Sequence, residues 1–274
     1  MAMQNNRTLS EKISDASIRT ITAVVLFYLV VPIFAIVPLS FTSGSLMIFP
    51  IPEFSLKWYQ DFASNPLWTR ATFNSVVIAL ATTTAATTLG TLAALGLNRT
   101  GPRVRRIVAA LLIMPLIIPV VIMAVAFYYF LSALNLTGTA PGLILAHTLL
   151  ALPFVVITVS AALKGFDTNM VRAGASLGAP PLLVFRKITF PLIFPGILSG
   201  AVFAFATSFD ETVVALFVGS AELRTLPRQI FSGVTESVTP TIAAAAVVLL
   251  TVSISLMAIV ELLRRNSERL QHKP

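Results

Sequence analysis

The stretch "VRAGASLGAPPLLVFRKITFPLIFPG", residues 171–196, contains the signals that decide how this chain folds. The small residues at its start predict a short helix over residues 169–176, "NMVRAGAS". Gly178 suits the left-handed residue that follows a helix, because glycine has no Cβ to clash in that conformation. The proline pair after it cannot continue the first helix but is tolerated at the start of a second. We therefore predict a short helix, a sharp turn and a second helix, "LLVFRKITF", that runs into an apolar segment, and we call residues 169–191 the elbow.

The first helix of the elbow has few bulky side chains. Asp167 or Thr168 is the expected N-cap, since each offers a side-chain oxygen to the free backbone N–H groups of the first turn. The small residues of the helix and its turn are Ala173, Gly174, Ala175, Gly178 and Ala179. Such a surface lets another protein approach closely, although an ordinary helical hairpin at the membrane surface would have the same composition.

The composition indicates that most of the chain lies in lipid. Of its 274 residues, 56% are hydrophobic and 11% are charged, whereas a soluble domain carries about 25% charged residues. The formal net charge of +8 could suggest nucleic acid, but the basic residues lie between apolar runs, which is the pattern of membrane orientation. No nucleic acid is therefore expected as a partner. The chain has no cysteine, so disulfides, thiolate metal sites and cysteine nucleophiles are excluded.

The apolar runs predict an all-α polytopic membrane protein with six spanning helices, each of which needs about 20 residues. Residues 107–163 contain no charged side chain, and the turn-rich "NLTGTAPG" at 135–142 divides them into two spans. The other predicted spans cover residues 21–41, 71–97, 188–209 and 237–260. The first of these is longer than the roughly 7–15 apolar residues of a signal peptide, so it is expected to stay uncleaved.

The placement of lysine and arginine predicts the orientation, because cytoplasmic loops carry an excess of both. Only Lys57, Arg70, Arg224 and Arg228, out of 19 such residues, lie in loops on one side. The rest lie in the two tails, the second loop and the fourth loop. With six spans, both termini and the elbow are expected to face the cytoplasm.

Three further patterns predict contacts. Residues 50–66 have apolar side chains at helical spacing and predict a short outer-surface helix, which could receive a partner or anchor at the interface through Trp58 and Tyr59. The mixed loop at 219–240 could also receive a partner. In the second span, Thr82, Ala86, Gly90 and Ala94 recur every four residues. Small residues at that spacing predict close packing against another helix, of this chain or of a partner.

The elbow resembles the cytoplasmic motif of permease subunits of ATP-binding-cassette (ABC) importers. The family pattern is Glu-Ala-Ala, three residues, Gly, about nine residues, and an apolar ending that closes on Pro. Two positions depart from it, since Arg172 replaces the usual Glu and Gly174 replaces the second Ala. The resemblance implies a coupling helix that docks into a groove of the ATPase. Its expected docking residues are Arg172, Ala173, Gly174, Ala175, Leu177, Gly178, Ala179, Phe185 and Pro191.

The resemblance continues along most of the chain. "FSLKWY" at 54–59, "SFDETVVALFVG" at 208–219 and "TLPRQIFSGVTESVTPTIAA" at 225–244 are similar to the second permease of spermidine/putrescine-type importers. Relatives in that branch carry aminophosphonates, opines or ferric ion. The resemblance implies the type I ABC importer permease fold in a bacterial inner membrane. The implied partners are a homologous second permease, two ATP-binding subunits, a periplasmic solute-binding protein and a small cationic solute.

The spans and the resemblance together divide the chain. The expected segments are a cytoplasmic tail at 1–20, a first helix at 21–41, a periplasmic loop at 42–70, an ABC-type core at 71–263 with the coupling loop at 164–187, and a cytoplasmic tail at 264–274.

Phe209, Asp210 and Glu211 are the expected pathway residues, because two acids directly follow an uncharged span before the apolar sequence resumes. An acid deep in the bilayer costs roughly 2.5–3.5 kcal/mol on insertion scales and is expected to face protein or a water-filled path. A carboxylate there would attract an ammonium group. Alternatively, Asp210 caps a helix or pairs structurally with Arg224 or Arg228.

Prolines within the spans predict kinks that could serve a gate. These are Pro115, Pro119, Pro153, Pro191 and Pro195. His147 is expected to be a hydrogen-bonded packing residue and not a ligand. The sequence has no Gly-x-x-x-x-Gly-Lys-Ser/Thr loop, no His/Asp/Glu cluster for a metal and no catalytic triad, so ATP and Mg²⁺ are expected only on partner subunits. The rival class is an ion-coupled secondary transporter or channel in which Asp210 and Glu211 bind the driving ion.

Overall fold

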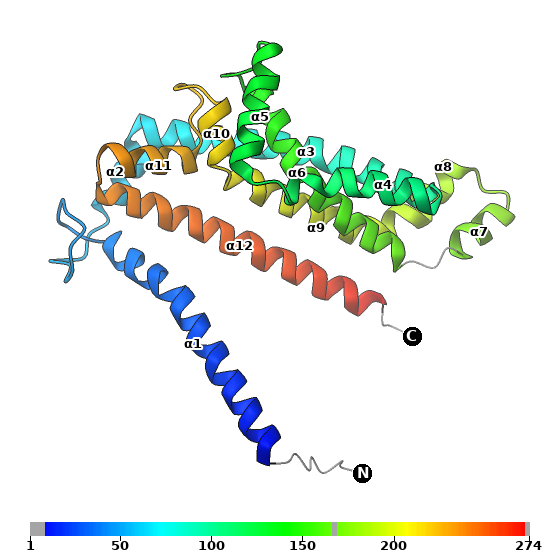
Figure 1. Ribbon diagram of the computed structural model, residues 1–274, viewed down its shortest axis with the longest axis horizontal. Coiled ribbons are helices and arrows are strands. Elements are labelled where there is room, and N and C mark those ends of the chain that lie inside the picture. Colours follow the sequence, from blue (N-terminus) through cyan, green and yellow to red (C-terminus); the bar gives the residue numbers. More distant parts are fainter. Residues whose placement is uncertain (1–8, 166–168, 272–274) are drawn as a thin grey trace.

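The structure, a computed structural model, describes residues 9–165 and 169–271. Within these residues the chain is an elongated helical bundle whose only β-type pairing is an isolated bridge between Thr42 and Phe54 (Figure 1). The helices are α1 Leu9–Leu39, α2 Lys57–Ser64, α3 Pro66–Arg99, α4 Pro102–Ile113, η1 Met114–Leu116, α5 Val120–Ala133, α6 Ala140–Lys164, α7 Asn169–Ser176, α8 Pro181–Val184, η2 Phe185–Thr189, α9 Phe190–Phe209, α10 Val213–Val218, α11 Leu226–Glu236 and α12 Pro240–Gln271. The all-α prediction is confirmed.

Five helices of the described chain are long and apolar enough to span a membrane, and a bent pair supplies a sixth span if its two parts count as one. That pair is the predicted third span. It breaks between Leu116 and Val120 with a bend of 100°. Pro115 lies in the short 3₁₀ turn η1 and Pro119 directly precedes α5. Both prolines lack the N–H that a continuous helix needs, so the expected kink is present but far sharper than a kink within one span.

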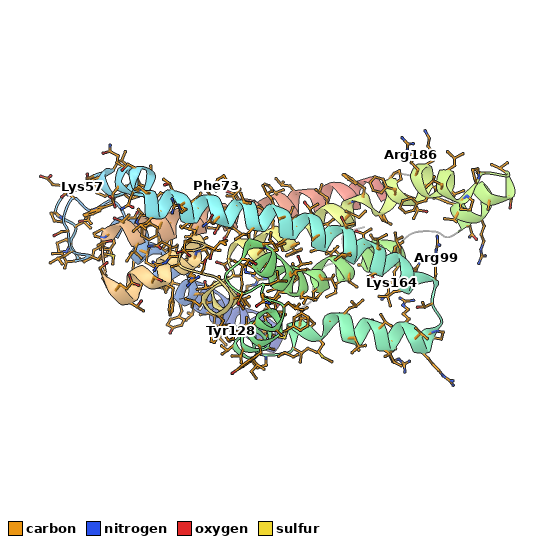
Figure 2. The ribbon with its side chains drawn as sticks, turned by 90° about the horizontal axis from the view of Figure 1, so that it is seen from above. Lys57, Phe73, Arg99, Tyr128, Lys164 and Arg186 are labelled. Atoms are coloured by element: carbon orange, nitrogen blue, oxygen red, sulfur yellow. The ribbon has the colours of Figure 1, made fainter. Side chains whose placement is uncertain are left out.

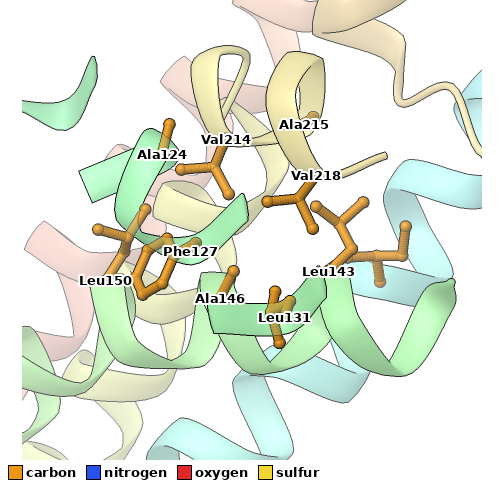
Figure 3. Close-up of a cluster of buried hydrophobic side chains, with 10 residues drawn as sticks. Ala124, Phe127, Leu131, Leu143, Ala146, Leu150, Val214, Ala215 and Val218 are labelled. Carbon is orange, nitrogen blue, oxygen red and sulfur yellow. The ribbon is translucent and has the colours of Figure 1, made fainter. Parts of the chain in front are cut away.

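Packing against α10 holds α5 in its new direction. Figure 3 shows apolar side chains of α5 against α10 and the first half of α6. This cluster comprises Ala124, Phe127 and Leu131 of α5, Val214, Ala215 and Val218 of α10, and Leu143, Ala146 and Leu150 of α6, together with Ile78 of α3. The backbone N–H of Gly138 also donates to the carbonyl oxygen of Val218 at 2.7 Å.

The core of the bundle lies between α3, α6 and α9. The stripe of Thr82, Ala86, Gly90 and Ala94 is buried, as the small-residue pattern predicts. A Cβ added to Gly90 would lie 2.7 Å from the Cβ of Val155 on α6. The stripe therefore packs within this chain, and its small side chains permit the close backbone approach that joins helices in lipid.

The ends of the first two spans differ from the hydropathy prediction. The first spanning segment begins at Ser14 and α3 begins at Pro66, so Arg70 lies inside a helix. The side-chain oxygen of Asn65 accepts a hydrogen bond from the N–H of Leu67, and Pro66 follows at the first helical position. A local cap thus sets where this helix begins, upstream of the apolar run. In Figure 1, α1 diverges from the rest of the bundle, and its apolar window is not buried.

The predicted outer helix is present as α2, whereas the loop at 219–240 contains a helix that hydropathy did not indicate. This helix, α11, buries one face against α3 and α12. Gly233 shows how close this packing is, because a Cβ there would approach Ile242 to 3.0 Å. Half of that loop is therefore part of the packed structure.

Candidate functional site

The elbow has the helix–turn–helix geometry that the sequence predicts. Its first helix, α7, ends in a Schellman motif, in which the N–H of Ala179 donates to the oxygen of Gly174 and the N–H of Gly178 donates to that of Ala175. Gly178 has φ +78°. Pro181 is the first residue of α8. The expected N-cap, Asp167 or Thr168, lies outside the described residues.

The second part of the elbow is not a regular α-helix. A single turn of α8 passes into the π-helix η2 before α9 begins. The N–H of Phe190 donates to the oxygen of Phe185, and the next residue, Pro191, has no N–H to donate. We attribute the wider turn to this proline, since its ring would clash with the carbonyl four residues earlier in an α-helix. Phe185 and Phe190 lie with ring centroids 6.2 Å apart.

Gly174 is the one buried residue of α7, and it packs against side chains of α8 and η2. A Cβ at this position would lie 3.0 Å from Cδ1 of Ile188 and 3.4 Å from a methyl group of Val184. An alanine would therefore require Ile188 to move. Arg172 is exposed, and no described contact of this chain accounts for the arginine.

The rest of α7 and its turn presents apolar and small side chains to the outside. Leu177 is 88% exposed and Met170 is 49% exposed, and both lie outside the spanning segments. Ala173 and Ala175 are also exposed. Isolated exposed leucines are common, but here the leucine lies at the tip of a glycine turn beside a helix of small residues, so that together they form an exposed apolar surface.

The two predicted pathway acids lie at the other end of α9, and they differ from each other. Phe209 is buried and stacks on Phe205, with ring centroids 5.5 Å apart. Glu211 is half-buried, and its Oε1 accepts a hydrogen bond from the N–H of Val214 at 2.9 Å, so it caps α10. Asp210 is exposed, and no hydrogen bond of its carboxylate is found among the described residues. We call residues 209–211 the acidic corner.

Burial raises the pKa of both carboxyl groups of the acidic corner. For Asp210, desolvation alone raises the pKa. For Glu211, desolvation raises the pKa most, the charge of Asp210 adds to this, and the N–H groups of Val213 and Val214 oppose it. Removal from water disfavours the charged form of an acid, so both positions would gain from a cation.

Neither arginine of the following loop is hydrogen-bonded to these acids in the described chain. Arg224 donates to Oε1 of Gln229 at 3.2 Å, and Arg228 donates to the backbone oxygen of Ser220 at 2.7 Å. Burial, followed by the charge of Arg224, lowers the pKa of Arg228. Glu211, and not Asp210, is therefore the acid whose side chain caps a helix, and no hydrogen bond of Asp210 with Arg224 or Arg228 is found among the described residues.

Three polar residues that were not predicted from the sequence form hydrogen bonds between distant segments at this end of the molecule. On α3, Asn74 donates to the backbone oxygens of Glu222 and Arg224, and Ser75 accepts from the N–H of Leu226 at 2.7 Å. Ser208, on α9, lies 2.9 Å from Nδ1 of His147. His147 is therefore a buried, hydrogen-bonded packing residue, as predicted. A polar residue inside an apolar run indicates that its side chain has a hydrogen-bond partner, but the sequence does not show which residue that partner is.

No cluster of three or more His, Cys, Asp or Glu side chains suited to a metal ion occurs in the described part of the chain. The elbow and the acidic corner lie at opposite ends of one helical run, Pro181–Phe209. Figure 2 places Arg186 at one end of the bundle and Lys57 at the other. The elbow is therefore continuous with the helix that ends at the acidic corner.

Comparison with known proteins gives consistent matches. The family model described as "Binding-protein-dependent transport system inner membrane component" matches residues 86–269. The chain is 33% identical over 244 residues to the spermidine/putrescine transport system permease protein PotC of Haemophilus influenzae, covering 89% of this chain and 95% of PotC. It is 34% identical over 230 residues to the putrescine transport system permease protein PotI of Escherichia coli K12, covering 81% and 82%.

A solved structure shows the same fold. A chain of a bacterial ABC transporter involved in the import of the acidic polysaccharide alginate matches with a TM-score of 0.70 at 14% identity. The match covers 96% of this chain and 99% of that one. At this identity the likeness concerns the fold alone.

Proposed function

Because the chain belongs to the family of binding-protein-dependent transport system inner membrane components, we propose that it forms half of the translocation pathway of an ABC importer for polyamines. The predicted family and permease fold are confirmed by the family match, the relatives and the structural likeness. The polyamine solute is supported by the names of PotC and PotI, which match over most of this chain.

In this proposal the chain works as one subunit among several. A homologous permease supplies the other half of the pathway, two ATP-binding subunits bind ATP and Mg²⁺, and a periplasmic protein delivers the solute. Both termini and the elbow face the cytoplasm, which the lysine and arginine distribution supports. The chain itself performs no catalysis and binds no cofactor.

The observation that carries the coupling role is the exposed tip of the elbow. Leu177, at 88% exposure, follows a helix whose outer face consists mainly of small residues. Burying a leucine side chain against a partner stabilises a complex by about 1.5–3 kcal/mol. The Schellman turn and the proline start of α8 fix the direction in which this leucine points.

The continuous run from α8 through η2 to α9 supplies the mechanical link. Closure of the ATP-binding subunits would carry the elbow with it, and the movement would reach the acidic corner through α9. Pro195 lies inside α9 and removes one backbone hydrogen bond there. This run therefore leads from the turn after the docking helix α7 to the acidic corner without a further loop.

The acidic corner fits a cationic solute. Asp210 is exposed, has no described hydrogen-bond partner for its carboxylate, and has a pKa raised by desolvation. A diamine or triamine passing this point would replace lost hydration with charge attraction. Glu211 contributes to the negative potential while capping α10.

Reconstitution tests the proposal. The chain, co-purified with its companion subunits, is placed in proteoliposomes, and uptake of labelled spermidine is measured with and without enclosed ATP and with the solute-binding protein outside. We expect uptake only when ATP and the binding protein are both present. Uptake by this chain alone, dependent on an ion gradient and insensitive to ATP, would establish the rival secondary transporter.

The same preparation tests the solute. Competition by putrescine, an aminophosphonate, an opine and ferric ion separates the branches of the family. If labelled spermidine is not taken up whereas one of the other labelled solutes is, in the presence of ATP and the binding protein, the importer class stands and the polyamine assignment fails.

A further inference from the structure

The cation-rich end of the bundle contains a cavity that neither the coupling role nor the solute path uses. It has a volume of about 300 Å³ and lies between the end of α3, the helix α4 and the second half of α6. Its apolar wall includes Ala109 and Ile113 of α4 and Val156 of α6. Two cations, Arg105 and Lys164, are also among its lining residues.

The polar side chains that line this cavity have no hydrogen-bond or ion-pair partner among the described residues. Arg105 is half-buried and Lys164 is exposed, and no hydrogen bond or ion pair of either side chain occurs within the described residues. The same holds for the side chains of Asn98 and Ser160, which also line the cavity. No aspartate or glutamate is among the lining residues. Two cations and two neutral polar groups thus line one space, and no acid of the described residues lines it with them.

The surroundings extend this positive region. A second cavity, of about 390 Å³, shares Asn98 and Leu163 with the first and adds Arg99 and Arg172. Figure 2 shows Arg99 and Lys164 at the same end of the bundle. A site with positive charge at the end of spanning helices and apolar walls along them matches an amphiphile with an anionic head and hydrocarbon tails.

We propose that the cavity between α3, α4 and α6 binds an anionic phospholipid, whose phosphate lies between Arg105 and Lys164 and whose acyl chain lies along Ile113 and Val156. Asn98 and Ser160 are within the same lining and supply neutral hydrogen-bonding groups for the glycerol portion. Such a lipid would fill the space beside α4, a helix that has no buried residue of its own. The inference requires the membrane placement of the chain but not the identity of the transported solute.

Native mass spectrometry of the purified transporter complex tests this site. The complex is incubated with equal amounts of phosphatidylglycerol and phosphatidylcholine, and retained lipid is quantified for Arg105→Gln/Lys164→Gln. The matched control is Arg103→Gln/Arg106→Gln, which removes the same charge from exposed positions of the same helix that do not line the cavity. We expect phosphatidylglycerol retention to fall about tenfold or more in the cavity variant, because this variant loses both cations that lie near the phosphate. The control should lose much less.

Four results would each overturn the proposal. Equal loss in both variants would assign the binding to general surface charge, and equal retention of phosphatidylcholine by the unmodified complex would show that no anionic head is selected. Displacement of the lipid by millimolar glycerol phosphate would assign the site to a free phosphate. If the double variant fails to assemble, Lys164→Gln alone, at an exposed position, must still lower retention about threefold or more; unchanged retention would refute the site.

Discussion

The acidic corner and the elbow terminate the same helical run, yet the chain holds them in place by different means. Around the acidic corner, hydrogen bonds link residues far apart in sequence, such as Ser75 with Leu226 and His147 with Ser208. At the elbow, the described hydrogen bonds are local backbone bonds, and Leu177 is exposed to 88%. One end is thus completed by its own chain, whereas the other presents a surface suited to another protein. The elbow is therefore the end of the run to which our proposal assigns a partner protein.

The largest effect is expected at the elbow. Gly178→Val places a β-branched residue at φ +78°, which costs of order 1–3 kcal/mol in backbone strain although a Cβ there would meet no neighbour. Relief of that strain would straighten the turn and move Leu177, so solute-stimulated ATP hydrolysis by the reconstituted complex should fall to its unstimulated level. Gly101→Val is the control, since Gly101 also has open space but a φ of −62°. If solute still stimulates ATP hydrolysis normally in Gly178→Val, the turn of the elbow has no role in coupling.

The next effect concerns the α3 side of the acidic corner. Ser75→Ala leaves the buried N–H of Leu226 without its acceptor, which costs about 1–3 kcal/mol of stability. We expect a melting temperature several degrees lower for the purified complex. Thr84→Ala removes an exposed hydroxyl that bonds only its own helix and should leave the melting temperature nearly unchanged. Equal melting temperatures for the two variants would mean that the Ser75–Leu226 hydrogen bond does not help to stabilise this end of the molecule.

A smaller effect is expected on the rate of solute uptake. Asp210→Asn removes a charge whose attraction for an ammonium group 4 Å away is about 1 kcal/mol in water, so uptake of a polyamine at limiting concentration should fall about fivefold. Glu222→Gln, an exposed acid of the neighbouring loop, is the control. Normal uptake in Asp210→Asn would show that the charge of Asp210 does not attract the solute and that the residue is structural.

The Asp210→Asn variant should fold normally. Burial raises the pKa of Asp210, so the carboxyl contributes most to stability when protonated, and this contribution is lost as the pH rises through the folded-state pKa. At neutral pH the asparagine removes a cost of folding. Asp210→Asn is therefore expected to be at least as stable as the unmodified chain by thermal melting at neutral pH.

The smallest effect is a pH dependence. Because burial raises the pKa of both Asp210 and Glu211, they take up protons at a higher pH than exposed acids do. As the outside pH falls below neutral, polyamine uptake should decline, and the decline should be shallower in Asp210→Asn, which has one carboxyl fewer to neutralise. An identical profile for the two proteins, measured as initial uptake rate, would exclude titration of Asp210 as its cause.

The elbow could be predicted in detail because its signals are local. A glycine that accepts positive φ and a proline that begins a helix need no distant residue, and both occur where the sequence indicates. The π-turn was not anticipated, since it depends on how Pro191 competes with the continuing helix. The tight approach of Ile188 to Gly174 likewise appears only once the two helices of the elbow are folded together.

The acidic corner was predicted less completely because its partners are remote. Asp210 and Glu211 were found by their charge, but only the fold shows that Glu211 caps α10. The hydrogen bonds of Asn74 and Ser75 join residues about 150 positions apart, and no local pattern specifies such pairs. The prolines of the third span predicted a kink, whereas its 100° bend follows from packing of α5 on α10.

That bend has a consequence for the lipid around the molecule. The 12 residues of α4 and the 3 of η1 together rise about 24 Å, less than the roughly 30 Å thickness of the hydrocarbon layer. Since α5 turns away by 100°, it adds little length along the membrane normal. For a helix α4 that runs along the membrane normal, we therefore expect the bilayer beside it to thin by several ångströms, at a cost of fractions of a kcal/mol per ångström, and transport activity to depend on the acyl-chain length of the surrounding lipid.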